Sequence, residues 1–280
     1  MKCLKFYDIK IGFIILFGIV SIFRENGMAQ KNEKNWWNNK KCAVCLTYDD
    51  ALNVHLDSVI PVLNSLGLKG TFYLSGNFQT VQERANDWKL AADNGHELGN
   101  HTLFHPCDGK MPGRNWVNPD YDLSTYTLSR ITDEIKIANV LLQIIDGKSK
   151  RTFAYPCGDT QVGGVSYIDV IKENFVGARS TETRFETIDD IDLYNIGCFM
   201  INGESGVELI DLAKNALNNK ALVVFLFHGV GGEHNLNVSL EAHNQLINFL
   251  KQNEKDIWIA PLVEIADYVT NYREKSANDR

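Results

Sequence analysis

Short apolar runs alternate with amphipathic stretches along most of this chain. The run from Leu222 to Phe227 is continuously apolar, which is typical of a strand covered on both faces. Between residues 54 and 66 the apolar residues instead recur at the spacing of one helix face. Regular alternation of this kind predicts an α/β fold built on a parallel sheet or barrel.

The same pattern sets the expected elements along the chain. It predicts strands at residues 42–48, 70–75, 96–100, 151–156, 175–179, 194–201, 221–227 and 256–260. It predicts helices at residues 54–66, 80–93, 129–146, 165–174, 205–218, 239–253 and 262–272.

One long stretch, residues 106–127, interrupts this rhythm. It contains three prolines and the aromatic residues Trp116, Tyr121 and Tyr126. A loop of this length in a compact domain is usually functional or disordered. We expect it to form one wall of a functional site, with Trp116 available to stack on a sugar. The alternative is a surface loop pinned by its own aromatic side chains.

The N-terminus has the pattern of a secretory signal. Lys2, Lys5 and Lys10 precede the short apolar run from Ile11 to Phe23, which is too short to span a bilayer comfortably. We therefore expect a signal peptide at residues 1–29, with cleavage after Ala29, and a secreted or periplasmic protein. An uncleaved membrane anchor is the alternative reading.

The remaining chain is expected to contain a single catalytic domain. Residues 30–40 are mostly polar and are predicted to be a linker, residues 41–272 form the domain, and residues 273–280 form a polar tail. The chain has 280 residues, of which 44% are hydrophobic, and this suffices for one large core. The net charge of −7 argues against nucleic acid as a partner, and against a membrane partner beyond the signal segment.

The cysteines do not suggest a disulfide framework. After the signal segment an odd number remains, namely Cys42, Cys45, Cys107, Cys157 and Cys198. Cys42 and Cys45 form a C-x-x-C within a predicted strand, where residues three apart point to opposite faces. We therefore expect both to be buried apolar residues rather than a metal or redox site.

Two short segments contain residues suited to metal chemistry. His101 and His105 lie four apart, and Asp49 and Asp50 follow the predicted strand at 42–48. Imidazoles and one carboxylate can hold a divalent ion that keeps a position open for water. A second carboxylate can then act as a base on that water. The carboxyl ends of strands are where α/β folds place such chemistry.

Each of these residues also has a structural explanation. Asp49 and Asp50 could cap a helix that follows the strand. His101 and His105 could be polar loop residues, and His228 could be a hydrogen-bonded structural histidine at a strand end. We expect His96 to be structural, His55 and His243 to lie on helix surfaces, and His234 to be a solvated loop histidine.

Four motifs in this chain resemble those of the polysaccharide deacetylases with a NodB homology domain, carbohydrate esterase family 4. Thr47-Tyr-Asp-Asp50 resembles the T-F-D-D motif, and Gly95 to His105 resembles the H-[ST]-x-x-H motif with its preceding strand. Phe153 to Gly158 resembles the third motif, and Leu226 to Gly229 resembles the last. The four occur in the family's order across residues 41–268, which makes the resemblance specific.

The resemblance implies a distorted (β/α) barrel and the removal of N- or O-acetyl groups from a carbohydrate polymer or oligosaccharide. It implies one divalent metal ion on Asp50, His101 and His105, with zinc expected and cobalt, nickel or manganese as alternatives. Asp49 would be the base that activates the metal-bound water, and His228 would protonate the leaving group. The backbone N–H of Cys157 would stabilise the oxyanion, while Tyr155, Pro156 and Trp116 would contact the acetylated carbohydrate.

The chain also departs from the family pattern. Ala154 stands where the third motif has an arginine that orients the base, and Arg151 lies three residues earlier. Cys157 replaces the family tyrosine. The fourth motif, an aspartate and tryptophan pair, is not recognisable, although Asp189, Asp190 and Asp192 lie in the corresponding part of the chain without a tryptophan.

These departures keep two other functions open. The same fold and metal site could act on a non-sugar amide. Alternatively, the protein could be a carbohydrate-binding relative without catalytic activity.

Overall fold

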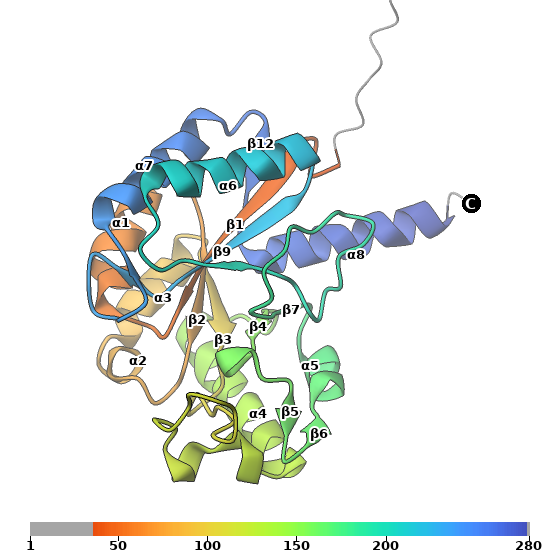
Figure 1. Ribbon diagram of the computed structural model, residues 1–280. Helices are drawn as coiled ribbons and strands as arrows, with labels where there is room; N and C mark the ends of the chain where they lie inside the picture. Colours follow the sequence, from red (N-terminus) through yellow and green to blue (C-terminus); the bar gives the residue numbers. More distant parts are fainter. Residues whose placement is uncertain (1–35, 279–280) are drawn as a thin grey trace, which may run out of the picture. The chain divides into compact units, whose positions relative to one another are not determined.

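The computed structural model describes residues 36–278, and a parallel, curled sheet organises them (Figure 1). The strand order is β7-β4-β3-β2-β1-β9-β8, and β12 pairs with the first half of β1. The strands are β1 (Cys42–Asp49), β2 (Thr71–Leu74), β3 (Glu97–Asn100), β4 (Phe153–Ala154), β7 (Ala178–Arg179), β8 (Phe199–Met200), β9 (Leu222–Phe227) and β12 (Ile257–Ile259). The architecture is a distorted (β/α) barrel, as the sequence predicted.

Helices cover the outside of this sheet (Figure 1). They are η1 (His55–Val59), α1 (Ile60–Ser65), α2 (Gln79–Glu83), α3 (Ala85–Asp93), α4 (Leu128–Asp146), α5 (Ile168–Asn174), α6 (Gly206–Asn219), α7 (Leu240–Gln252) and α8 (Leu262–Asn278). Short 3-10 turns are η2 (Pro119–Tyr121), η3 (Leu123–Thr125) and η4 (Pro156–Gly158). Two small ribbons pair β5 (Gln161–Val162) with β6 (Val165–Ser166), and β10 (Gly229–Val230) with β11 (Asn237–Val238).

The central strand β1 divides the core into two layers. Cys42, Val44, Leu46 and Tyr48 pack outward against α6 and α7, whereas Ala43 and Cys45 pack with residues of α8. Side chains alternate along a strand, so Asp49 lies on the same face as Ala43 and Cys45. The prediction for the C-x-x-C is confirmed, because both thiols are buried, free and on opposite faces.

Most predicted elements are present with shifted ends. All eight predicted strands occur, although β4, β7 and β8 are only two residues long. The helix expected at 80–93 is divided at Arg84, whose backbone is not helical. The helix expected at 165–174 starts only at Ile168, because the β5–β6 hairpin occupies the preceding residues.

The two ends of the domain differ from expectation. Trp37, in the predicted linker, is fully buried, and its Nε1 donates a hydrogen bond of 2.8 Å to the Lys220 carbonyl. Helix α8 continues to Asn278, through most of the predicted polar tail. The predicted signal peptide lies outside the described residues. Among the residues that are described, no helix combines the length and apolarity needed to cross a membrane.

Four buried histidines make the stability of the fold sensitive to acid. Burial lowers the pKa of His55, His101 and His243 to about 4 and that of His96 to about 3, against an ordinary value of 6.5. The unfolded chain therefore binds protons below 6.5 that the folded chain does not bind. Their contribution to the free energy of unfolding therefore keeps its full value above pH 6.5 and decreases as the pH falls toward 4.

We predict that the urea midpoint of the metal-free protein falls steadily between about pH 6.5 and about pH 4.5. The His96→Gln variant should show a shallower decline, because it removes one of the proton-linked groups. Denaturant unfolding at a series of pH values measures both slopes. Equal slopes in the two proteins would contradict this account.

Candidate active site

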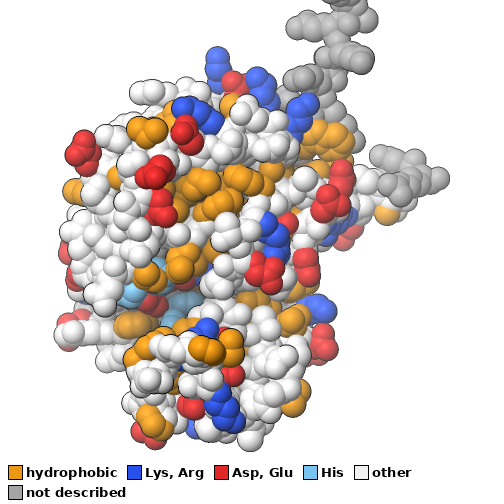
Figure 2. Space-filling model, viewed as in Figure 1, with side chains coloured by type: hydrophobic (Ala, Val, Ile, Leu, Met, Phe, Trp, Pro, Cys, Tyr) orange, Lys and Arg blue, Asp and Glu red, His pale blue; other side chains and the backbone are white. Residues whose placement is uncertain are grey.

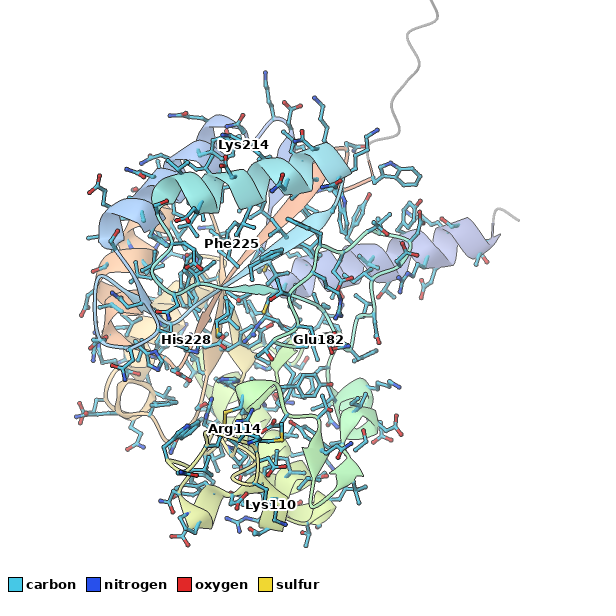
Figure 3. All side chains as sticks on the ribbon, in the orientation of Figure 1. Lys110, Arg114, Glu182, Lys214, Phe225 and His228 are labelled. Atoms are coloured by element: carbon cyan, nitrogen blue, oxygen red, sulfur yellow. A yellow bond between two sulfur atoms is a disulfide. The ribbon has the colours of Figure 1, made fainter. Side chains whose placement is uncertain are left out.

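The predicted site residues meet at the carboxyl ends of β1, β3 and β9. Tyr48 of β1 is in register with Phe227 of β9, so Asp49 and His228 emerge side by side. His228 lies at the end of β9 in Figure 3. Figure 2 shows histidine side chains exposed in a hollow of the surface. The parallel sheet therefore collects residues from distant parts of the chain, as the sequence predicted.

Unusual backbone conformations aim these side chains. Asp50, Ala51, Thr102 and His105 all have positive φ, with values of 73°, 49°, 65° and 52°. Non-glycine residues adopt this region rarely, and such strain concentrates at functional sites. Here it turns the chain sharply after β1 and β3, so that Asp50 and His105 face each other.

Asp50, His101 and His105 form a group that fits a divalent cation. The Nε2 atoms of His101 and His105 lie 3.8 and 3.6 Å from Asp50 Oδ1. Potential ligand atoms of the three side chains all lie within 4.8 Å of one another. Asp50 Oδ1 is buried and has no hydrogen-bond partner among the described residues. A buried carboxylate oxygen facing two imidazole nitrogens is a suitable donor set for such an ion.

The protonation of His101 suits this role. Its Nδ1 lies 2.8 Å from the Ala154 carbonyl, which can only accept, so Nδ1 carries the proton and Nε2 keeps its lone pair. Burial lowers the pKa of His101 to about 4, so the ring is neutral near pH 7. A neutral imidazole with a free Nε2 is the form that binds metal.

Arg179 holds the base candidate, Asp49. Both side chains are buried, at 0% and 4% exposure, and Arg179 Nη2 bonds to Asp49 Oδ2. Burial is the largest single influence and raises the pKa of Asp49, but the combined effects of Arg179, His101 and His228 outweigh it, and the net effect lowers the pKa. Asp49 Oδ1 has no hydrogen-bond partner within the described part of the chain. Asp49 is therefore ionised and has one oxygen free.

Arg179 is the arginine that contacts Asp49, although the third motif of this chain has Ala154 where an arginine was expected. Ala154 and Arg179 are direct partners in the parallel pair of β4 and β7, so the arginine lies one strand away at the same level. Arg151 instead pairs with Asp146, at 3.2 Å, and donates to the Leu98 carbonyl. The sequence reasoning missed Arg179, although an arginine at the end of a predicted strand was a usable signal.

His228 is fixed mainly through its backbone. Its carbonyl accepts a bond of 2.7 Å from His55 Nε2, while His55 Nδ1 accepts from the Leu52 N–H. Its own Nε2 lies 3.9 Å from Asp50 Oδ2. Burial lowers the pKa of His228, and the carboxylates of Asp49 and Asp50 partly oppose this.

Several expectations for the other histidines were wrong. His55 and His243 are fully buried rather than on helix surfaces, and His243 bonds to the Tyr48 hydroxyl. His234 is not simply solvated, because its ring stacks on that of His228 with centroids 4.7 Å apart. The ring of His96 is buried and accepts from the Gly70 N–H, which agrees with a structural role. Helical periodicity alone did not reveal the polar partners that bury His55 and His243.

A disulfide between Cys107 and Cys157 corrects the prediction that the cysteines form no framework. It joins the loop after His105 to η4, and Cys157 there has a positive φ of 56°. The Cys157 carbonyl accepts from Arg114, which lies beside the disulfide in Figure 3. The two sulfurs lie near His105, but they are bonded to each other and so do not form a second metal site.

The three residues predicted to contact the substrate differ in how exposed they are. Tyr155 is 1% exposed and donates to the Tyr194 carbonyl, and Pro156 is also buried, while their role in substrate binding stays a prediction. Tyr155 packs in a hydrophobic cluster with Phe153 and Tyr167, and Pro156 is the first residue of η4. Trp116 is 64% exposed and stays available for a ligand. Tyr121 stacks on Phe104 and Tyr126 is buried, so the 106–127 loop is pinned largely by its own aromatics.

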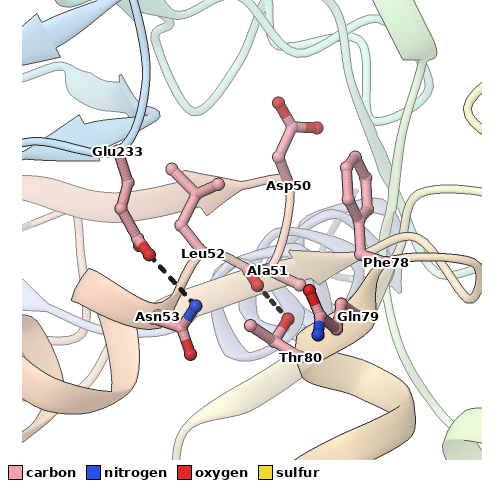
Figure 4. Close-up of a pocket in the computed structure, with 8 residues that line it drawn as sticks. All are labelled: Asp50, Ala51, Leu52, Asn53, Phe78, Gln79, Thr80 and Glu233. Carbon is pink, nitrogen blue, oxygen red and sulfur yellow. Dashed lines mark hydrogen bonds between the residues drawn. The ribbon is translucent and has the colours of Figure 1, made fainter.

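A small cavity of about 170 Å³ opens beside Asp50 (Figure 4). Phe78 borders it near Asp50, and Glu233 reaches from the loop after β10 to bond to Asn53. Three aspartates lie in the part of the chain where the fourth motif would occur. Asp189, Asp190 and Asp192 are exposed, and the last two bond within their own loop.

The family model for polysaccharide deacetylase matches residues 38–167. The chain resembles the polysaccharide deacetylase family over these residues, which make up just under half of its length. This match contains β1 with Asp49 and Asp50, the two histidines after β3, and the third motif. The family is generally metal-dependent, and the three-residue group described above provides a possible site for the ion.

The curated relatives that match this chain include deacetylases. The chain is 30% identical over 120 residues to the peptidoglycan-N-acetylmuramic acid deacetylase PdaA of Bacillus subtilis, covering 42% of this chain and 39% of that protein. It is 24% identical over 163 residues to a chitin deacetylase of Pestalotiopsis, covering 58% and 48%. The chain thus spans less than half the length of these curated relatives.

The fold is similar to that of a putative polysaccharide deacetylase from Mycobacterium smegmatis, with a TM-score of 0.59 at 13% identity, over 84% of this chain and 92% of that one. It is also similar to that of Bacillus subtilis PdaA, a family 4 carbohydrate esterase, with a TM-score of 0.50 at 21% identity, over 82% and 81%.

We predict that His101→Ala and His105→Ala each abolish tight binding of one divalent ion, because each removes one of three ligands. His96→Gln, at a buried histidine outside the site, should bind metal normally. Metal content after dialysis and titration calorimetry measure the difference. Full occupancy in both alanine variants would show that the site is assigned wrongly.

We predict that the double variant Cys107→Ala/Cys157→Ala loses about 2–4 kcal/mol in free energy of unfolding, because the disulfide closes a long loop in the unfolded chain. Denaturant unfolding with and without a reducing agent measures this. Reductant should destabilise the parent protein but not the double variant, since Cys42, Cys45 and Cys198 are free thiols. An equal response of both proteins to reductant would contradict the prediction.

Proposed function

We propose that this protein is a metal-dependent hydrolase that removes N- or O-acetyl groups from a carbohydrate polymer or oligosaccharide. The observation that carries the proposal is the buried Asp49–Arg179 pair beside the metal-ligand group. It provides an ionised base 3.8 Å from the Nε2 atom of His101. The match to the polysaccharide deacetylase model supports the same reaction class.

Zinc is the ion we propose, because two histidines and one aspartate with an open position are typical of catalytic zinc. Cobalt, nickel and manganese are alternatives with similar ligand preferences. When bound, the ion would polarise the acyl carbonyl and make water a better nucleophile near neutral pH.

The protein's own residues would move the protons. Asp49 accepts a proton from the attacking water through its free Oδ1, while Arg179 keeps the carboxylate ionised and oriented. His228 gives a proton to the departing amine or alcohol, which leaves poorly without one. The backbone N–H of Cys157 would donate to the developing oxyanion. A pure carbohydrate-binding protein needs no such base and acid.

The substrate would lie across the hollow that contains the histidines, with Trp116 as the exposed aromatic surface for a sugar ring. We also propose that the protein is secreted or periplasmic. The Cys107–Cys157 disulfide supports an oxidising compartment.

We predict acetate release when the protein, stripped of metal and reloaded with zinc or cobalt, is given chitooligosaccharides, peptidoglycan fragments or acetylated xylan. Asp49→Asn should lower kcat by at least about 100-fold, the lower range for a general base, while metal and ligand still bind. An enzymatic acetate assay and calorimetry measure the two properties. Bound metal without acetate from any glycan would favour the non-sugar amide or the silent carbohydrate binder.

We predict that Arg179→Ala lowers kcat about 100-fold and moves the acidic limb of the kcat/KM profile to higher pH. Removing the guanidinium leaves burial to raise the pKa of Asp49, so the base is protonated over more of the acidic range. Metal affinity should change little. A pH–rate profile with metal titration measures both.

Arg151→Ala is the matched control, because Arg151 is also buried and paired with an aspartate but lies away from Asp49. It should destabilise the protein without moving the acidic limb. The role assigned to Arg179 fails if both variants shift the profile alike.

A further inference from the structure

The side chain of His228 lacks a polar support. Its Nδ1 is buried without a hydrogen-bond partner among residues 36–278. The other proposed site residues are held differently, because His101 donates to a carbonyl and Asp49 pairs with Arg179. The bond from His55 reaches only the backbone of His228 and leaves its ring free to turn.

The ring of His234 lies on the ring of His228. The centroids are 4.7 Å apart and the planes are inclined by 13°, so the two imidazoles are stacked. His234 Nε2 lies 3.8 Å from Asp50 Oδ2, as close as the Nε2 of His228 at 3.9 Å. His234 is the more exposed of the two, at 32% against 13%. It therefore covers one face of His228 at the mouth of the site.

The parallel stacking argues against a shared ion on the two histidines. Imidazoles that bind one ion direct their nitrogen lone pairs toward a common point, as the inclined rings of His101 and His105 can, at 73°. The rings of His228 and His234 lie in nearly parallel planes, so their nitrogen lone pairs do not converge on one point. Contact between ring faces is the interaction that this geometry provides.

The loop that carries His234 is anchored firmly. The Nδ1 atom of His234 accepts a hydrogen bond of 3.0 Å from the backbone N–H of Leu236. The adjacent Glu233 accepts from the Val54 N–H at 2.7 Å and from Asn53 at 3.0 Å, which ties the loop to the start of η1 (Figure 4). The Asn237 side chain accepts from the Gly232 N–H. His234 is thus presented by a fixed frame rather than by a free loop.

We propose that His234 is a positioning residue for His228, and that it orients the acid ring by stacking. The proposal rests on the proposed function, because it treats His228 as the acid. It assigns His234 no proton transfer and no metal bond.

Kinetics of three variants test the stacking. His234→Ala should lower kcat about tenfold with little change in KM, the rate equivalent of losing one aromatic pair. His234→Phe keeps a flat ring and should recover most of that loss. Asn235→Ala, at the exposed next residue, is the matched control for disturbing the loop and should behave like the parent. A His234→Phe variant as slow as His234→Ala, or a fully active His234→Ala, would overturn the proposal.

A second measurement does not depend on turnover. In the zinc-loaded protein with ¹⁵N-labelled histidine, long-range ¹H–¹⁵N spectra report the order of each ring, and a His228→Gln variant identifies the His228 signals. These should be single and sharp in the parent and in His234→Phe, and broadened or doubled in His234→Ala. Unchanged signals in His234→Ala would refute the positioning role. A parent protein without acetate release would instead refute the proposed function and leave this result standing.

Discussion

The buried ion pair between Asp49 and Arg179 is the interaction on which the site depends. Burying either charge alone would be costly, so each requires the other. Their strands are not neighbours, because β2, β3 and β4 lie between β1 and β7 in the sheet. Arg179 reaches Asp49 only because the sheet curls, and its guanidinium crosses above the ring of Tyr73 on the way. The curvature of the barrel and the ionisation of the candidate base Asp49 are therefore linked.

The same pair explains how the chain tolerates an altered family motif. The guanidinium must contact Asp49 from the inner face of the barrel, but this contact does not require one particular strand to carry the arginine. Ala154 is small and lies in register with Arg179, so the guanidinium stands one strand away from the position where the resembled motif has its arginine. The disulfide acts similarly in η4, where a covalent bond to the loop after His105 supports the residue that replaces the family tyrosine.

Two other features hold the site residues in place, namely unusual backbone angles and contacts from neighbouring histidines. Positive φ angles at Asp50 and His105 turn the chain so that the candidate metal ligands face each other. Around His228 the support comes from histidines, one below on its carbonyl and one stacked on its ring. Both come from segments that carry no recognised family motif. The site thus combines residues of the recognised motifs with supporting residues from outside them.

The sequence by itself determined the order of strands and helices, the fold class and the positions of Asp49, Asp50, His101, His105 and His228, because periodicity and motif spacing are local properties. It did not determine the partners of those residues. Arg179 reaching Asp49, Cys107 joining Cys157 and His234 stacking on His228 are contacts across 130, 50 and 6 residues that no periodicity encodes. The curled sheet decided them, since it alone brings strand ends and loops within bonding distance. Burial of Tyr155 and His55 was decided in the same way, by the layers that pack around them.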